Sequence, residues 1–244
     1  MFRASAFGLL SGFGDSDFGF QANRSRDAKG RIEFACRSCH VRRVQTERVI
    51  VFVKAPRMGT VKTRIAQTAG AERACAIYRQ MVDGIVENLS AFKEVQLRFT
   101  PDDARQEIQE WLRDGWSAQP QGSGELGERL DRAFQENFAE GLKRVAIIGS
   151  DCPEVGTSDV RAALSELKSH DLVVGPAVDG GYWLIGLRAP RSELFRDILW
   201  SSDQVLAQTL ARAKTLGLRI QLLRILTDID TEKDWNAYVR QSGV

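Results

Sequence analysis

Along residues 48–240, short apolar runs alternate with segments that carry apolar residues three and four positions apart. The short runs predict strands at residues 48–54, 95–99, 145–148, 172–177, 182–187 and 218–222. The helical spacing predicts helices at residues 71–90, 108–112, 125–141, 160–167 and 205–213 and after Thr231, with a loop at residues 119–124. This alternation predicts an α/β fold with a mainly parallel central sheet and helices on both faces. We expect residues 47–244 to form this one domain.

Residues 1–46 differ from the rest of the chain. They hold six of the twelve phenylalanines among Gly, Ser, Asp and Arg, without helical or strand periodicity. Cys36, Cys39 and His40 match the haem-attachment pattern C-x-x-C-H, but an export signal is missing, and a zinc site would need a second ligand pair. We therefore expect a disordered extension, or sequence translated from a gene whose start was assigned too far upstream, and no metal or haem site.

The composition limits the classes of partner. The chain is 43% apolar and 27% charged with a net charge of +2, so nothing indicates nucleic acid or an anionic membrane as a partner. No apolar run approaches the roughly 20 residues of a transmembrane helix. Four unevenly placed cysteines do not make a disulfide scaffold. We expect a cytoplasmic enzyme with small-molecule substrates; no pattern predicts a particular oligomeric state.

A basic segment follows the first predicted strand. Lys54, Arg57, Lys62 and Arg64 fall within eleven residues, and Gly59 would let the backbone approach a ligand. Cations at the carboxyl end of a buried strand are typical of phosphate binding, although a solvated basic loop would show the same pattern. Neither a Walker loop nor a G-x-G-x-x-G fingerprint fits, because Gly59 stands alone. The segment predicts charge-assisted bonds to a di- or triphosphate.

A carboxylate follows a middle strand. Asp151 comes after the run at residues 145–148, where open α/β sheets bind their ligands. Mg²⁺ or Mn²⁺ takes one or two carboxylates together with phosphate oxygens, so Asp151 is a candidate metal ligand and catalytic residue. The alternative is an aspartate that only bonds backbone N–H groups of its own loop. The adjacent Cys152 has no histidine nearby in sequence, which favours a buried thiol over a nucleophile.

Two further features contain acids. Asp228 and Asp230 flank one apolar residue and would point the same way in extended chain, so they could converge on a metal; alternatively, Asp230 or Thr231 only caps the last helix. Asp179 begins a tight turn next to aromatic residues, which suits a sugar or base and makes Asp179 a candidate catalytic base. The acceptor pocket predicted there comprises Gly180, Gly181, Tyr182 and Trp183, with Trp200 and Ser201 as a second lip.

Six blocks in fixed order give the chain a family resemblance over residues 48–240. The chain resembles the bacterial GT-A-fold family labelled as glycosyltransferases of arsenosugar-biosynthesis type, otherwise a domain of unknown function. It is more distantly similar to the 2-phospholactate and molybdenum-cofactor guanylyltransferases. The blocks are F-V-K-A-P-R-M-G-T-V-K-T-R at 52–64, L-G-E-R-L at 126–130, G-S-D-C-P at 149–153, D-G-G-Y-W-L-I-G-L at 179–187, W-S at 200–201 and D-I-D-T at 228–231.

The resemblance implies a transferase fold that binds a nucleoside diphosphate and a divalent metal. It also implies roles for single residues: phosphate contacts by Lys54, Gly59, Lys62 and Arg64, a base or sugar border at Gln121 and Gly122, and metal ligation by Asp151 with Asp230 or Asp228. Two positions depart from the family pattern, since Met58 precedes Gly59 and Pro153 stands where a D-x-D metal motif has its second acid.

These observations support three hypotheses. The first is a metal-dependent glycosyltransferase that acts on a nucleoside-diphosphate sugar and a small-molecule acceptor. The second is a nucleotidyltransferase that releases pyrophosphate from a nucleoside triphosphate, which the missing second acid of the D-x-D motif favours. The third is a nucleotide-binding protein without catalytic activity.

Overall fold

The structure is a computed structural model that describes residues 25–26, 32–33 and 46–242. The chain divides into two units, Met1–Val44 and Gln45–Val244. In the first unit the described residues form two short antiparallel strands, β1 (Ser25–Arg26) and β2 (Ile32–Glu33). The predictions made for Cys36, Cys39 and His40 lie outside the described residues.

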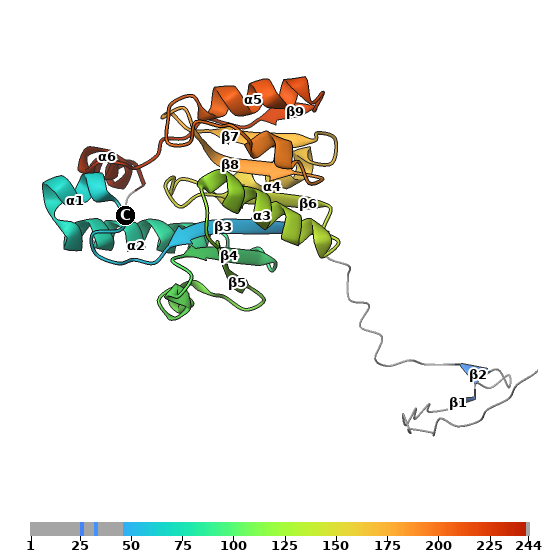
Figure 1. The fold of residues 1–244 in the computed structure, drawn as a ribbon. Helices are drawn as coiled ribbons and strands as arrows, with labels where there is room; N and C mark the ends of the chain where they lie inside the picture. The colour runs from blue at the N-terminus through green and yellow to red at the C-terminus, as the bar shows by residue number, and fades with distance from the viewer. Residues whose placement is uncertain (1–24, 27–31, 34–45, 243–244) are drawn as a thin grey trace, which may run out of the picture. The chain divides into compact units, whose positions relative to one another are not determined.

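The second unit is built on a seven-stranded sheet with the order β5-β4-β3-β6-β8-β7-β9 (Figure 1). Strand β8 runs antiparallel to both of its neighbours, and the other pairs are parallel. The strands are β3 (Glu47–Lys54), β4 (Val95–Thr100), β5 (Ser117–Pro120), β6 (Arg144–Ile148), β7 (Leu172–Pro176), β8 (Tyr182–Leu187) and β9 (Ile220–Leu222). The predicted mainly parallel sheet of an α/β protein is therefore confirmed.

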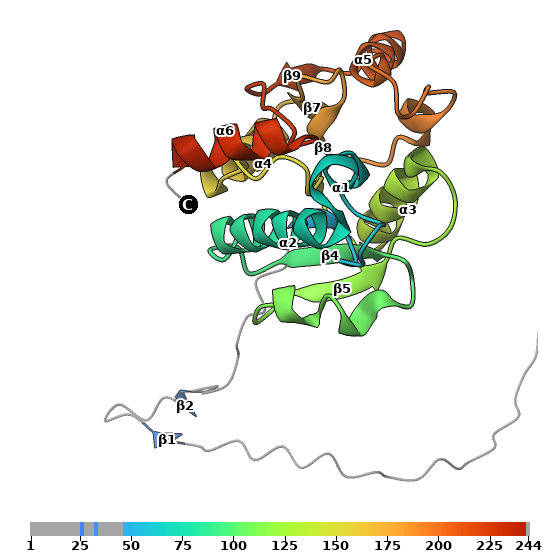
Figure 2. The same cartoon turned by 90° about the vertical axis from the view of Figure 1, so that its left-hand side faces the viewer.

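Helices cover both faces of this sheet. Figure 2 shows α2 and α4 on one face, with α3 and α5 on the other. The helices are α1 (Thr63–Ala69), α2 (Ala71–Asn88), α3 (Leu126–Ala139), α4 (Thr157–Glu166), α5 (Val205–Thr215) and α6 (Glu232–Ser242). Three short 3₁₀ turns, η1 (Ala104–Gln106), η2 (Gln109–Trp111) and η3 (Ser192–Phe195), lie in the connections.

The side chains of β3 alternate between two cores. Val49 and Val51 pack into the core under α2 and α4, whereas Ile50 and Phe52 pack into the core under α3 and α5. A strand buried on both faces has no polar side, which is why the sequence of β3 is a continuous apolar run. A third cluster joins α1, α2 and α6 through residues such as Ile65 and Trp235. This cluster ties the segment that follows β3 to the end of the chain.

Helix α1 and strand β5 of the second unit were not predicted from the sequence pattern. Helix α1 buries only Ile65 among its seven residues, so it shows no apolar periodicity. Strand β5 overlaps the predicted loop at 119–124; it lies at the edge of the sheet, buries only Ala118, and ends at Pro120. An edge strand tolerates proline and polar residues because one side of its backbone forms no ladder. Both elements therefore carry too few apolar residues to be detected by pattern.

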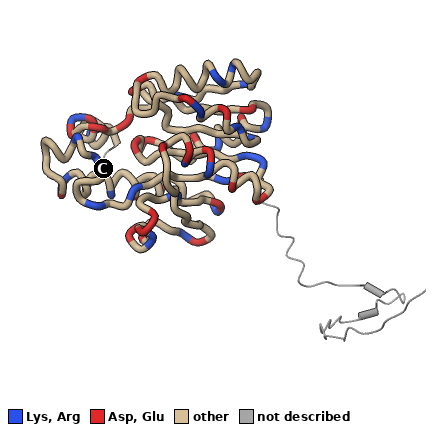
Figure 3. The backbone as a smooth tube through the Cα atoms, in the orientation of Figure 1, with Lys and Arg blue, Asp and Glu red and all other residues tan. Residues whose placement is uncertain are grey.

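The polar surface of the second unit is mixed in sign. Figure 3 shows Lys and Arg interspersed with Asp and Glu along the chain of this unit. Within the residues that the structure describes, no helix combines the length and the apolar character needed to span a membrane.

Candidate active site

The order of the strands places a crevice between β3 and β6. From β3 the chain adds β4 and β5 on one side and then returns to add β6 on the other side of β3. Open α/β sheets bind ligands at such a reversal, outside the carboxyl ends of the strands. A cleft of about 810 Å³ lies there, lined by Lys54 at the end of β3, Asp151 after β6 and Asp179 after β7. Three separately predicted residues therefore share one cleft.

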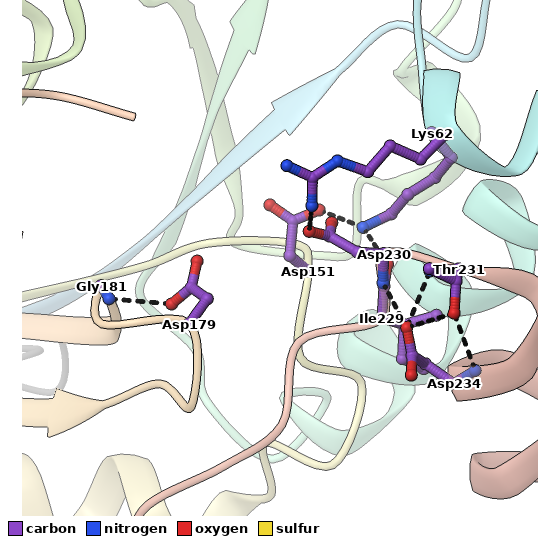
Figure 4. A network of polar contacts seen from close by, with 9 residues as sticks. Lys62, Asp151, Asp179, Gly181, Ile229, Asp230, Thr231 and Asp234 are labelled. Carbon is purple, nitrogen blue, oxygen red and sulfur yellow. Dashed lines mark hydrogen bonds and ion pairs between the residues drawn. The ribbon is translucent and has the colours of Figure 1, made fainter. Parts of the chain in front are cut away.

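Lys62 and Asp151 form the central ion pair at this edge. The Lys62 ammonium lies 2.5 Å from Oδ1 of Asp151 and also donates to the backbone carbonyl of Ile229 at 2.7 Å (Figure 4). The Lys62 side chain is 5% exposed, whereas that of Asp151 is 61% exposed. Asp151 therefore presents its carboxylate to the cleft, and no backbone N–H of the described residues bonds to that carboxylate.

The backbone of Lys62 is itself unusual. It has φ 46° and ψ 51°, the left-handed conformation, immediately before α1 begins. For a residue other than glycine, a sparsely populated conformation costs roughly 1–3 kcal/mol and is found most often at functional sites. Contacts at the end of its side chain, to Asp151 and Ile229, link the start of α1 to β6 and to the late loop.

The late loop supplies a second ion pair and a helix cap. Arg64 donates to Oδ2 of Asp230 at 2.5 Å. Thr231 and Asp234 exchange hydrogen bonds at the start of α6, because the Thr231 N–H donates to Asp234 at 2.8 Å and the Asp234 N–H donates to the Thr231 hydroxyl at 3.3 Å (Figure 4). Thr231 therefore caps α6, whereas the carboxylate of Asp230 pairs with Arg64.

The acids of the cleft act on one another at Asp228. Burial raises the pKa of the Asp228 carboxyl, and the nearby charges of Asp179, Asp230 and Asp151 raise it further. Such mutual repulsion is relieved by a bound cation. Among the described residues, no three His, Cys, Asp or Glu side chains stand in a ready-made ligating group. A complete protein cage is therefore not seen, whereas a site with two carboxylates and substrate oxygens is compatible with this donor set.

Asp179 shapes the turn between β7 and β8. Its Oδ1 accepts the N–H of Gly181 at 2.8 Å, which is the ordinary bonding of an Asx turn (Figure 4). Its exposed side chain still lines the cleft. Gly180 lies between them with φ +88°, and a Cβ atom there would come within 2.1 Å of the Asp203 carbonyl oxygen. The turn is thus packed against the segment before α5.

We expect a Gly180→Ala substitution to lower the free energy of unfolding by about 1–3 kcal/mol, since it meets both a left-handed backbone and the Asp203 carbonyl. Gly84 offers a matched control: it lies inside α2, and its added Cβ would meet no atom within 4 Å. Gly84→Ala should raise the free energy of unfolding by up to about 1 kcal/mol. Urea denaturation of the two variants measures both signs, and equal effects would contradict the packing described.

An aromatic wall borders the far side of the cleft. Tyr182, Trp183 and Trp200 all line it, as does Ser201. Trp183 is 2% exposed and its indole N–H donates to the Arg224 carbonyl at 3.1 Å, so it acts mainly as core. The Trp200 ring packs so closely on α3 that a Cβ at Gly127 would lie 2.7 Å from it. Tyr182 and Trp200 remain half-buried and accessible to a ligand.

The segment at Gln121 and Gly122 is held mainly by its own bonds. Gln121 lines the cleft, but its amide group donates to the backbone carbonyls of Val53 at 3.1 Å and Arg98 at 2.9 Å. Arg129 of α3 donates to the Gln121 side-chain oxygen at 3.1 Å and also lines the cleft. Gly122 does not line the cleft, and its N–H donates to Asp102 at 3.1 Å.

Two residues of the basic segment lie away from the cleft. The Arg57 guanidinium bonds both oxygens of Glu107 and one of Asp103 and does not line the cleft. These partners raise the pKa of Arg57, and Arg57 in turn lowers that of Glu107. Gly59 has φ +78°, and a Cβ atom added there would meet no atom within 4 Å. The left-handed backbone of the turn therefore explains the glycine, whereas close packing does not. Lys54 and Arg64 therefore line the cleft, and Lys62 reaches it through its bond to Asp151. Arg57 and Gly59 lie outside it.

Cys152 is buried beneath the site. It is 2% exposed, and burial together with the charge of Asp151 raises the pKa of its thiol. A thiol of this kind is a poor nucleophile, because the thiolate is the reactive form. The packing role inferred from sequence therefore fits its surroundings.

Four residues of the site were not singled out from the sequence. Arg129 and Asp203 line the cleft, as does Ser150, whose hydroxyl contacts the buried Tyr78. Arg129 lies within the block L-G-E-R-L, so a signal was present in the sequence. Tyr78 is one of many apolar-face residues of α2, and nothing in its spacing distinguishes it from core.

Comparisons with known proteins give one family match and similar solved structures. The profile of one family, described as an uncharacterised protein conserved in bacteria (DUF2064), matches residues 88–202. A solved protein of Desulfovibrio desulfuricans G20, provisionally named a nucleotide-diphospho-sugar transferase, is 31% identical, covers 81% of this chain and 88% of its own, and has a TM-score of 0.75. None of the curated proteins matches.

Two more distant structures share the architecture. CMP:2-keto-3-deoxy-manno-octonic acid synthetase, solved with CTP, is 10% identical with a TM-score of 0.53 and covers 81% of this chain and 98% of its own. The 4-diphosphocytidyl-2C-methyl-D-erythritol synthase of Anaerococcus prevotii is 10% identical with a TM-score of 0.51 and covers 80% of this chain and 100% of its own. At this identity the likeness concerns the fold alone. The chain belongs to the DUF2064 family of bacterial proteins and has the fold of the nucleotide-diphospho-sugar transferases.

Proposed function

We propose that this protein is a metal-dependent transferase that acts on a nucleoside-diphosphate sugar. The observation that carries the proposal is the bond of Lys62, at 2.5 Å, to Asp151, a residue that lines the cleft between β3 and β6. A candidate phosphate-binding cation and a candidate metal ligand thus lie side by side where this class of sheet binds ligands. The free protein keeps the two charges neutralised by each other until a diphosphate and a metal ion replace them.

Three cations would bind the diphosphate. Lys54 is exposed at the end of β3, and Lys62 and Arg64 flank the start of α1. Their bonds to phosphate oxygens would be charge-assisted and would stabilise the negative charge that develops on the departing nucleoside diphosphate. Arg57 is not needed for this role, since Glu107 and Asp103 already neutralise it.

Mg²⁺ or Mn²⁺ would be held by Asp151 and by Asp228 or Asp230. These carboxylates fit the group because burial raises the pKa of Asp228 and the neighbouring acids raise it further, so that a bound cation would stabilise its ionised form. When bound, the metal would supply charge neutralisation at the phosphate oxygens. The protein's own contribution is to orient Asp151, whose backbone carbonyl accepts the Ile229 N–H at 2.9 Å and so joins the two acidic loops.

The acceptor would enter at the turn after β7. Asp179 retains one carboxylate oxygen that bonds no described residue, so it can accept the proton of an attacking hydroxyl. Tyr182 and Trp200 give this side an apolar wall suited to a sugar ring. The 31%-identical protein provisionally named a nucleotide-diphospho-sugar transferase supports glycosyl transfer. An acceptor of arsenosugar biosynthesis, implied by the family resemblance, stays a prediction.

Nucleotidyl transfer is the second candidate. Asp151 is the single acid directly after β6, because Pro153 occupies the place of a second one, and the further carboxylates come from the late loop. This arrangement departs from the D-x-D motif of glycosyltransferases. In this case a hydroxyl or phosphate acceptor would attack the α-phosphate of a nucleoside triphosphate.

A thermal-shift screen followed by a product assay tests the proposal. Nucleotide sugars and nucleoside triphosphates are added with Mg²⁺ or Mn²⁺, and a ligand that binds the folded protein raises its melting temperature. We expect a nucleotide sugar to raise it and free nucleoside diphosphate to be released in the presence of acceptor. Pyrophosphate released from a triphosphate would instead support nucleotidyl transfer. Binding without turnover of either class would favour a non-catalytic nucleotide-binding protein.

A further inference from the structure

Tyr78 reaches from α2 to the backbone of both loops that form the phosphate end of the cleft. Its ring is buried, at 2% exposure, beneath the end of β3. The phenol oxygen accepts the backbone N–H of Lys54 at 2.7 Å and lies 3.1 Å from the hydroxyl oxygen of Ser150. One buried side chain thus contacts the residue that ends β3 and the residue that precedes Asp151.

The direction of the second hydrogen bond follows from counting protons. The Lys54 N–H is a donor only, so the Tyr78 oxygen accepts there. The phenol has one proton of its own, and burial raises its pKa, which keeps that proton in place. Among the described residues, the Ser150 oxygen is the one acceptor bonded to it. An unpaired buried donor is unfavourable, so Tyr78 donates to Ser150.

Ser150 then has a proton left to donate. Its oxygen is already occupied by the proton of Tyr78, and no described residue accepts the Ser150 hydroxyl hydrogen. The residue is 6% exposed, and the small exposed part belongs to the lining of the cleft. A bond accepted from Tyr78 polarises the serine hydroxyl and strengthens it as a donor. A hydrogen-bond acceptor for the Ser150 hydroxyl would therefore lie in the cleft, beside Asp151.

We propose that Ser150 is a ligand-binding residue that donates its hydroxyl proton to a phosphate oxygen, and that Tyr78 is the positioning residue that aims it. This inference rests on the proposed function, since it assumes that a diphosphate occupies the cleft. A phosphate oxygen suits the site because it accepts hydrogen bonds and has no proton to offer at neutral pH. The relay from the Lys54 N–H through Tyr78 to Ser150 also fixes the spacing of the loops after β3 and β6.

Inorganic pyrophosphate with Mg²⁺ is the decisive probe, because it has neither base nor sugar. Calorimetry should show that Ser150→Ala binds it about ten- to a hundredfold more weakly than the wild type, the usual effect of a bond to a charged group. Ser192→Ala is the matched control: its hydroxyl donates to Asp131 at 2.8 Å outside the cleft, and its affinity for pyrophosphate should equal that of the wild type. Mn²⁺ binding to Ser150→Ala without phosphate should also be unchanged, which shows that Asp151 has not moved.

A double-mutant cycle tests the positioning role of Tyr78. Tyr78→Phe should weaken pyrophosphate binding. In the Ser150→Ala background the same substitution should cause no further loss, because Tyr78 then has no serine hydroxyl to position. Additive losses would overturn the positioning role. If Ser150→Ala bound pyrophosphate as tightly as the wild type does, the inference would be overturned and the proposed function would stand. If the wild type binds neither pyrophosphate nor any nucleotide with Mg²⁺, the proposed function falls and the inference falls with it.

Discussion

Replacing Asp151 with asparagine is expected to lower the rate of metal-dependent transfer by about 10²–10³-fold while the fold stays intact. Asparagine has the shape of aspartate but no charge, so a divalent cation loses one of its proposed ligands. Electrostatic stabilisation of the departing phosphate is worth several kcal/mol, and roughly 1.4 kcal/mol corresponds to a tenfold change in rate. The bond from the Ile229 N–H goes to the backbone carbonyl of Asp151 and is not altered.

The measurement combines turnover with Mn²⁺ binding followed by electron paramagnetic resonance. Asp197→Asn is the matched control, because its side chain is 87% exposed and it lies outside the cleft. Asp197 has φ +52°, a conformation that asparagine tolerates, so this control should keep wild-type stability and turnover. If Asp151→Asn binds Mn²⁺ and nucleotide as the wild type does, Asp151 is not a metal ligand. That result would favour a nucleotide-binding protein without catalytic activity.

The position of Asp151 was predictable because strand patterning is strong in this chain. An apolar run of residues 145–148 ends directly before Gly149, and the carboxyl ends of parallel strands meet at one sheet edge. The same reasoning placed Lys54 at the carboxyl end of β3. The antiparallel direction of β8 does not disturb it, since the turn before β8 starts at the same edge, where β7 ends.

The partners of the charged residues were not predictable in the same way. Arg57 and Lys62 are both cations of one loop, yet Arg57 pairs with Glu107 and Lys62 with Asp151. The difference arises from the path of the chain between residues 55 and 62, where the left-handed Lys62 turns the backbone into α1. Apolar periodicity carries no information on such a path, because these residues form neither strand nor helix. The number of cations in the loop therefore does not distinguish Arg57 from Lys62.

Hydrogen-bond relays are hidden from sequence for a related reason. Tyr78 occupies a position on α2 that an apolar side chain would fill equally well in the pattern. Only the structure shows that its hydroxyl forms hydrogen bonds with Lys54 and Ser150, which lie 24 and 72 positions away in the sequence. Contacts of this range are set by the packing of α2 on the sheet.

Lys62→Met is expected to change the two ligands in opposite directions: nucleotide binding about ten- to a hundredfold weaker, and Mn²⁺ binding in the absence of nucleotide roughly fivefold tighter. Methionine suits the 5%-exposed stem of Lys62 and removes only the charge. The diphosphate loses a charge-assisted bond. Mn²⁺ no longer competes with an ammonium for Asp151, and repulsion between unit charges about 4 Å apart is worth about 1 kcal/mol even in water.

Opposite signs separate this mechanism from simpler ones. A general loss of structure would weaken both ligands, and a lysine that only binds phosphate would leave Mn²⁺ binding unchanged. Lys168→Met, at an exposed lysine outside the cleft, controls for the lost charge and should change neither affinity. Arg64→Met should shift both affinities less than Lys62→Met, because Arg64 is 71% exposed and solvent screens its pair with Asp230.

Titrations of each variant with Mn²⁺ alone, with nucleotide alone and with both give the coupling between the two ligands. In the wild type each ligand should bind more tightly when the other is present, because the metal releases Lys62 from Asp151 and the released lysine then serves the phosphates. By linkage this gain is the same whichever ligand is added first. In Lys62→Met the gain should shrink, since no lysine remains to be released. A coupling of wild-type size in Lys62→Met would show that the pair of Lys62 and Asp151 is not what connects the metal to the nucleotide.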